Sequence, residues 1–175
     1  MTRVSPTAPP HTVHRVTPGD AARMRALRLE MLADSPLAFL ETLAQAAARP
    51  HADYRRRISQ AAAGNQLAQF VADPGGGRLI GHAGGTVLAD EPDATVVFAV
   101  YITPASRGSG VLTGLIETVA QWSVEAGRKE LMLEVVVGNV RAVRAYERLG
   151  FEDTGVRVPH PVTPALTELQ MRRRA

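Results

Sequence analysis

The sequence predicts an α/β fold built on a mixed sheet, and three observations lead to this prediction. The hydrophobic period alternates along the chain between about two and about 3.6 residues. Three strand-like segments between residues 66 and 102 follow one another across tight turns, which indicates an antiparallel meander. The strand-like segments near Val96 and Leu131 are separated by a whole helix, so they should be parallel and joined by a right-handed crossover.

The first third of the chain predicts a strand and two helices. Residues 1–11 are polar and hold three prolines, so we expect a disordered tail, with one domain over 12–175. A short strand is expected over residues 13–16. Thr17 and Pro18 are typical of a helix start, and this helix should run to about Ala33. We expect a connector of mixed character at 37–48 and a second helix at 52–63.

The remaining elements follow from similar patterns. Strands are predicted at 66–72, 79–88 and 95–102, and the last is apolar on both faces, as in a central strand covered on each side. A helix bearing Leu112 and Leu115 should end at Gly127, followed by a strand at 131–137. Asn139 should cap another helix, which Gly150 ends. Two final strands, at 151–156 and 166–171, complete the order β-α-α-β-β-β-α-β-α-β-β, with helices on both faces of the sheet.

Composition excludes several classes of function. The net charge of +3 comes almost wholly from arginine, which suits phosphate and carboxylate partners, but the basic residues are dispersed and aromatic residues make up only 5%. We therefore expect no nucleic-acid partner. The chain has neither a long apolar stretch nor a secretory signal, so we expect no membrane span and a cytoplasmic protein. It has no cysteine, and its five histidines lack ligand spacing, so we expect no metal.

The segment from Arg107 to Gly110 lies between a predicted strand and a predicted helix, where anions bind. The first amides of a helix have no partner within it, and the helix dipole adds partial positive charge there. Two glycines leave room for a phosphate to reach the backbone, Ser109 adds a hydroxyl and Arg107 adds a cation. The next helix has no acidic residue before Glu117. This turn is predicted to bind phosphate, although a flexible connector would also use glycine.

These residues resemble the GNAT superfamily of acyl-CoA-dependent N-acetyltransferases over residues 96–155. The family's pyrophosphate loop has Arg or Gln, two variable residues, Gly, one variable residue, then Gly or Ala; residues 107–112 fit at five positions, and Leu112 departs from the sixth. Residues 100–104 are similar to the strand end where the family holds the acyl and pantetheine groups. The second family signature, a helix with Asn and Tyr closed by Gly-Phe, is matched by Asn139, Ala142, Tyr146, Gly150 and Phe151.

The resemblance implies a GNAT-like fold and transfer of an acetyl group from acetyl-CoA to an amine, by direct attack in a ternary complex. The backbone of Val100 and Ile102 should pair with the acyl-pantetheine arm, and amides of residues 108–113 should hold the pyrophosphate. Leu112 should either join the apolar stripe of its helix or crowd the phosphates. The implied cofactor-binding residues are Val100, Tyr101, Ile102, Arg107, Gly108, Ser109, Gly110, Val111, Leu112, Thr113, Asn139, Ala142 and Tyr146.

Two catalytic residues are proposed from the sequence. Tyr146 is the candidate general acid, because a phenol is protonated at neutral pH and can donate to a departing thiolate. Glu134 is the candidate general base, because it interrupts an apolar strand beside the crevice. Glu30, Glu41 and a relayed water are further candidates for the base. Each residue also has a structural alternative: core packing for Tyr146, a salt bridge for Glu134 and a helix cap for Asn139.

Two other functions compete with acyl transfer. Gly108, Gly110 and Gly114 have a spacing seen in some dinucleotide loops, but too little chain follows for a doubly wound nicotinamide-binding fold. A non-catalytic acyl-CoA-binding module is the other alternative. The acceptor, a small molecule or a peptide amine, should be selected by residues 33–50, the second helix and residues 160–164. The resemblance to this family also suggests that the chain forms a homodimer.

Overall fold

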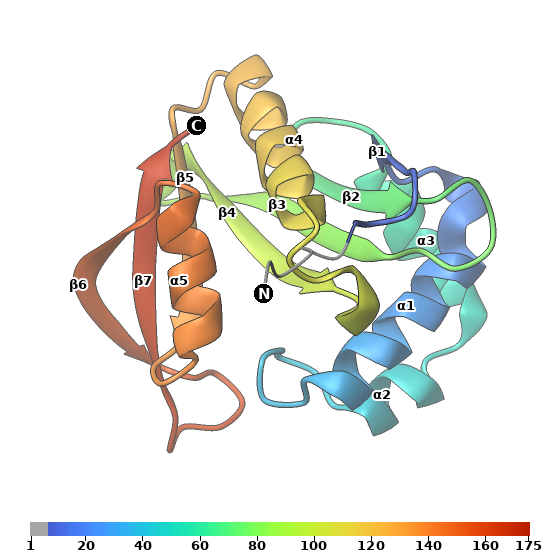
Figure 1. Ribbon diagram of the computed structural model, residues 1–175, viewed down its shortest axis with the longest axis horizontal. Helices are drawn as coiled ribbons and strands as arrows, with labels where there is room; N and C mark the ends of the chain where they lie inside the picture. The colour runs from blue at the N-terminus through green and yellow to red at the C-terminus, as the bar shows by residue number, and fades with distance from the viewer. Residues whose placement is uncertain (1–6) are drawn as a thin grey trace, which may run out of the picture.

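The computed structural model describes residues 7–175, which form a seven-stranded mixed sheet in the order β1-β2-β3-β4-β5-β7-β6 (Figure 1). The neighbours β4 and β5 are parallel, and the other neighbouring pairs are antiparallel. The predicted meander and parallel crossover are therefore confirmed. The strands are β1 (Thr12–Arg15), β2 (Leu67–Asp73), β3 (Gly81–Leu88), β4 (Glu91–Ile102), β5 (Glu130–Val136), β6 (Glu152–Pro159) and β7 (Thr167–Arg174). Part of the tail expected at 1–11, namely residues 1–6, lies outside the described residues.

Helices cover both faces of the sheet, as the sequence predicts. One core cluster joins α4 and α5 to the face that bears Phe70 and Leu133, and Figure 1 shows these two helices in front of the sheet. A second cluster joins α1 and α3 to the opposite face, which bears Val71 and Tyr101. Among residues 7–175, no helix has the length and apolar character that crossing a membrane requires. The helices are α1 (Ala21–Asp34), α2 (Leu43–Ala48), α3 (His51–Ala61), α4 (Val111–Glu125) and α5 (Val140–Arg148), with 3-10 turns at Pro18–Asp20 and Pro104–Ser106.

The connector expected at residues 37–48 contains the short helix α2. Thr42 and Gln45 form a reciprocal capping box, in which Gln45 N donates to Thr42 Oγ1 at 3.2 Å and Thr42 N donates to Gln45 Oε1 at 2.9 Å. Tyr54 of α3 then donates its hydroxyl to Ala46 O at 2.9 Å. These contacts, rather than any polarity contrast along α2, explain why the segment is helical.

β4 departs from β5 partway along its length, and this divergence creates the site. The parallel pairing covers only Ala94, Thr95 and Val96 of β4. In Figure 1 the two strands lie together at one end and apart at the other. The backbone of β4 from Val97 onward therefore has no strand partner on the β5 side. An open strand edge of this kind can pair with an extended ligand.

A β-bulge at Ala99 breaks the alternation expected along β4. Ala99 has φ 49°, the only positive φ among the non-glycine residues described, and the pairing to β3 shifts register here. As a result, Val97 and Ile102 both pack in the α4/α5 core, although a regular strand would place them on opposite faces. The regular alternation of side chains between the two faces is therefore interrupted at Ala99.

Candidate functional site

A cavity of about 700 Å³ lies where β4 and β5 diverge. It is lined by the open part of β4, the turn before α4, the end of β5 and the inner side of α5. This arrangement brings together most of the residues singled out from the sequence. Those that line the cavity are Val100, Tyr101, Ile102, Arg107, Gly108, Gly110, Leu112, Thr113, Glu134, Asn139, Ala142 and Tyr146. Ser109 and Val111 do not line it, and Val111 is buried in the core.

The turn before α4 presents backbone amides to this cavity. Gly108 and Gly110 have φ of 75° and 89°, the left-handed region that glycine adopts without strain, and Gly110 is the N-cap of α4. The first backbone hydrogen bond of the helix runs from Gly114 N to Gly110 O at 3.1 Å, so the amides just before Gly114 remain available. The first turn of α4 carries no acidic residue. The chemistry of this donor set fits a pyrophosphate.

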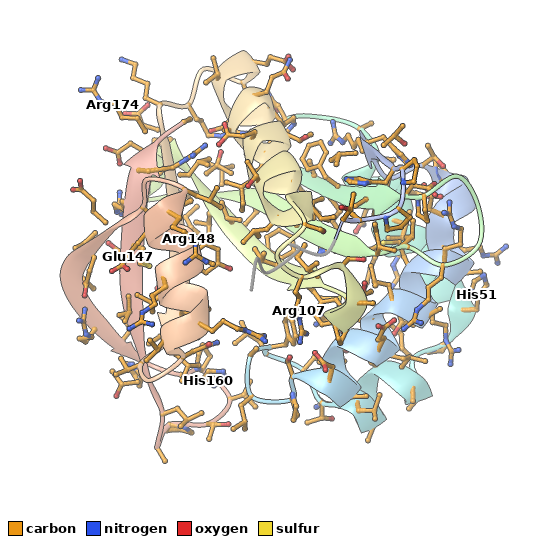
Figure 2. The ribbon with its side chains drawn as sticks, viewed as in Figure 1. His51, Arg107, Glu147, Arg148, His160 and Arg174 are labelled. Carbon is orange, nitrogen blue, oxygen red and sulfur yellow. The ribbon has the colours of Figure 1, made fainter. Side chains whose placement is uncertain are left out.

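The side chains of Arg107 and Ser109 are engaged within the protein. Arg107 Nε donates to Ile102 O at 3.0 Å, and its Nη2 pairs with Asp34 at the end of α1. The Arg107 guanidinium also stacks on the Tyr101 ring, 5.8 Å from the centroid, and Figure 2 shows Arg107 between α5 and α1. Ser109 Oγ donates to Ser106 O. These side chains hold the turn in place, which leaves the backbone amides as its anion donors.

Leu112 takes part in both the core and the cavity. Its side chain is half-buried, packs against the α4/α5 core cluster and also lines the cavity. Leu112 therefore joins the apolar stripe of its helix, and part of its side chain reaches the cavity.

Tyr146 lies on α5, Asn139 is the N-cap of this helix, and both line the cavity. The Tyr146 ring packs edge-to-face on Phe151 with 5.7 Å between centroids, and its hydroxyl has no hydrogen-bond partner among residues 7–175. Burial raises the pKa of Tyr146, so the phenol holds its proton across the neutral range. Asn139 Oδ1 accepts from Ala142 N at 3.3 Å, as an N-cap does. The amide nitrogen of Asn139 forms no hydrogen bond within the described part of the chain, so it can reach a ligand.

The candidate bases fall into two groups. Glu134 lines the cavity, is exposed and has no ion pair within the described part of the chain. Glu30 lies outside the cavity lining, accepts from Arg78 Nε at 2.9 Å and from the Tyr101 hydroxyl at 3.4 Å. Glu41 is also outside it and is paired with Arg28 and Arg49. Only Glu134 of the three is free to meet an acceptor in this cavity.

The structure adds a carboxylate that the sequence analysis missed. Glu168 of β7 lines the cavity, although its side chain is only 7% exposed. Its burial raises the pKa of this carboxyl, His160 acts against this shift, and the negative charge of Glu134 acts in the same direction as burial. The cavity wall on the other side includes Ser35, Ala38 and Phe39, from the segment expected to select the acceptor. Strand alternation could have placed Glu168 opposite Leu169, but not beside Glu134.

Comparison with known proteins points to one family. A model described as the acetyltransferase (GNAT) family matches residues 30–151. An aminoglycoside N(6')-acetyltransferase type 1 from Stenotrophomonas maltophilia is 30% identical over 82% of this chain and 87% of its own length. A mouse protein named probable N-acetyltransferase family 8 member 5 is 30% identical over 74% of this chain, which spans 55% of the mouse protein.

Solved structures share the fold at low sequence identity. A GNAT-family acetyltransferase from Streptococcus pneumoniae superposes with a TM-score of 0.78 at 17% identity, over 94% of this chain and 99% of its own. The structure of yncA from Salmonella typhimurium, solved with its cofactor acetyl-CoA, has a TM-score of 0.74 at 15% identity over 94% of both chains. A spermidine N-acetyltransferase from Vibrio cholerae, in complex with CoA and spermine, has a TM-score of 0.72 at 18% identity, over 94% of this chain and 95% of its own.

Proposed function

Because this chain belongs to the acetyltransferase (GNAT) family, we propose that it moves an acetyl group from acetyl-CoA to a small cationic amine by direct attack in a ternary complex. One observation carries the proposal. A single cavity holds the open edge of β4, the free amides at the start of α4 and the hydroxyl of Tyr146. Acyl transfer from CoA needs a site for an extended arm, a site for phosphates and a proton donor.

The chain's own residues divide the binding of acetyl-CoA among them. The amides that follow Gly108 hold the pyrophosphate, and Arg107 fixes the turn by its bonds to Ile102 O and Asp34. The pantetheine arm lies along the open edge of β4 as an added strand. Val100 is the main pairing residue, because Ile102 O already accepts from Arg107. When bound, acetyl-CoA would supply a thioester for attack and a thiolate that needs a proton.

Tyr146 supplies that proton. Its hydroxyl is free of other hydrogen bonds among the described residues, and its raised pKa keeps the proton in place until it is needed. Asn139 orients the acceptor or the arm through its free amide nitrogen. The proton acceptor for the incoming ammonium is one of the two carboxylates of the cavity, Glu134 or Glu168.

The acceptor side favours a positively charged amine. Glu134 and Glu168 have no cationic partner in residues 7–175, so a bound ammonium would be attracted there. The names of two relatives agree with this chemistry, since aminoglycosides and spermidine are cationic amines. We therefore place aminoglycosides and polyamines ahead of amino acids and peptide N-termini.

A thiol-release screen with Tyr146→Phe as its control tests the proposal. The purified chain is incubated with acetyl-CoA and a panel of aminoglycosides, polyamines, amino acids and peptides. We expect release of CoA with at least one cationic amine, and a fall in kcat of roughly 10²–10⁴-fold in Tyr146→Phe. The affinity for acetyl-CoA by calorimetry should change less than about threefold, because the phenyl ring keeps its packing on Phe151. If the chain binds acetyl-CoA but releases no CoA thiol in the presence of any amine of the panel, it is a non-catalytic module.

A further inference from the structure

Three polar side chains share one face of the sheet, on β5, on β7 and just after the end of β6. Glu168 of β7 is paired with Val136 of β5, so Glu134, two residues before Val136, lies diagonally across from it on the same face. Glu168 is also paired with Val158 of β6, so His160, two residues after Val158, lies diagonally across on its other side. Leu169 and Met171 point to the opposite face, into the α4/α5 core. The three polar residues therefore lie on the face away from α5.

His160 is buried with one donor that has no partner. Its ring is 2% exposed, and Nδ1 accepts from Val162 N at 3.2 Å and Thr163 N at 3.0 Å. Since Nδ1 is used as an acceptor, the proton of the imidazole must lie on Nε2. This Nε2 is buried and has no hydrogen-bond partner among residues 7–175. A buried donor without a partner is uncommon in proteins and calls for an explanation, and a catalytic role is one of them.

Glu168 is the complementary case, a glutamate that is only 7% exposed and has no donor. No hydrogen bond or ion pair to its side chain is formed within the described residues. Its position differs from that of Glu134, which is exposed to water. Burial disfavours the charged form of a carboxylate, so the proton of an approaching ammonium passes more readily to Glu168 than to a solvated glutamate.

We propose that Glu168 accepts the proton of the acceptor's ammonium, that His160 donates its Nε2–H to the Glu168 carboxylate once the acceptor is bound, and that Glu134 attracts the cation. This inference rests on the proposed acetyl transfer. Glu168 touches the reacting amine and is a catalytic residue in this scheme, whereas His160 acts through Glu168. The other charged residues that line the cavity are Arg107, Arg141 and Arg148.

The proton balance of the scheme is complete. Glu168 takes one proton from R–NH₃⁺ and leaves a neutral amine. As the nitrogen forms the new C–N bond and the C–S bond breaks, Tyr146 gives its proton to the sulfur and regains one from the nitrogen. Glu168 then releases its proton to water. One acetyl group moves from sulfur to nitrogen, and one proton is released to solvent.

The matched pair Glu168→Gln and Glu134→Gln tests the assignment. At pH 7, Glu168→Gln should lower kcat/KM for the amine at least 100-fold, and its rate should rise about tenfold per pH unit as free amine becomes available. Glu134→Gln should raise KM with little change in kcat. It should also move the acidic limb of the pH profile to lower pH, because the Glu134 charge no longer raises the pKa of Glu168. His160→Asn should move this limb to higher pH, because His160 lowers the pKa of Glu168 in the wild type.

A titration without substrate gives a second readout. The pKa of Glu168 is followed by NMR in protein labelled with carboxyl-¹³C glutamate, with Glu168→Gln assigning the resonance. It should lie above the ordinary glutamate value in the wild type and fall in Glu134→Gln. The assignment would be overturned if folded Glu168→Gln kept the wild-type kcat/KM, or if the acidic limb of the pH profile disappeared in Glu134→Gln rather than in Glu168→Gln. Either result would leave acetyl transfer intact. A wild type that releases no thiol with any amine would overturn the proposed function itself, and this inference with it.

Discussion

His82 of β3 donates a hydrogen bond from Nδ1 to the carbonyl oxygen of Ala99 at 2.7 Å, at the bulge where β4 opens. The other ring nitrogen lies 2.9 Å from the side-chain amide of Gln69, which can donate to it when its NH₂ group is turned inward. The ring is 2% exposed, and burial lowers the pKa of His82 to about 4. A neutral imidazole is therefore built into the sheet beneath the open edge of β4.

Replacing His82 should disturb the site as well as the fold. His82→Ala leaves the Ala99 carbonyl without its donor, so we expect the free energy of unfolding to fall by about 1–3 kcal/mol. We also expect kcat/KM to fall about tenfold, because small displacements in a binding site are sufficient for such losses. His82→Gln retains a donor and should recover most of both quantities. Urea denaturation and thiol release measure the two effects, and equal activity in all three proteins would show that the bulge does not depend on His82.

The same histidine predicts a pH dependence of stability. The pKa of His82 is about 4 in the folded protein and 6.5 when unfolded. Above pH 6.5 both states are neutral, so the full stability is present. Below pH 6.5 only the unfolded state gains the proton, so stability falls until about pH 4, by about 3 kcal/mol in total.

The measurement is urea denaturation between pH 4 and 7.5, with the difference between wild type and His82→Gln as the quantity of interest. This difference removes the contribution of other groups, such as His14, whose pKa is raised through its hydrogen bond to Arg15 O. Asp73, whose pKa is lowered mainly by Arg23, contributes only at lower pH, where its unfolded form becomes protonated. If the difference is constant across the range, His82 is not buried in neutral form.

Local patterns determine the elements of this fold but not the bulge. The order of strands and helices follows from hydrophobic period, caps and glycine positions, all of which are visible within a few residues. Ala99 reads as an ordinary position in an alternating apolar strand. Its carbonyl oxygen accepts a hydrogen bond from His82, 17 residues earlier in the chain. No pattern near Ala99 indicates that bond.

The residues of the site likewise divide into those that the sequence predicts and those that only the structure reveals. The Arg107–Gly110 turn, Asn139 and Tyr146 could be predicted because each belongs to a local motif, and the structure brings them to one cavity. Glu30 and Glu41 could not be separated from Glu134, because their arginine partners are set by tertiary contacts. Glu168 was missed because β7 lies between β5 and β6 in the sheet, an order that chain sequence does not reveal.

Gly110→Ala and Gly127→Ala form a matched pair for the phosphate turn. Both glycines have positive φ, 89° and 78°, and an added Cβ would meet no atom within 4 Å at either position. Each substitution should lower stability by about 1–2 kcal/mol, because only the backbone conformation is penalised. Gly110→Ala alone should weaken acetyl-CoA binding, by about tenfold, since Gly110 directs the first amides of α4. Calorimetry checks this, and equal losses of affinity in both variants would mean that a general loosening of α4, rather than the turn, is responsible.

Leu112→Ala tests whether the one departure from the family's loop pattern matters for the cofactor. The Leu112 side chain is half-buried against the core, so its removal should lower the free energy of unfolding by about 1–2 kcal/mol, below the range for a fully buried leucine. The affinity for acetyl-CoA should change less than about threefold, because the phosphate donors are backbone amides. Leu115→Ala is the control, since Leu115 is fully buried on the same helix outside the cavity lining and should be more destabilising with no effect on affinity. A tenfold gain in affinity for Leu112→Ala at unchanged stability would instead show that this side chain crowds the phosphates.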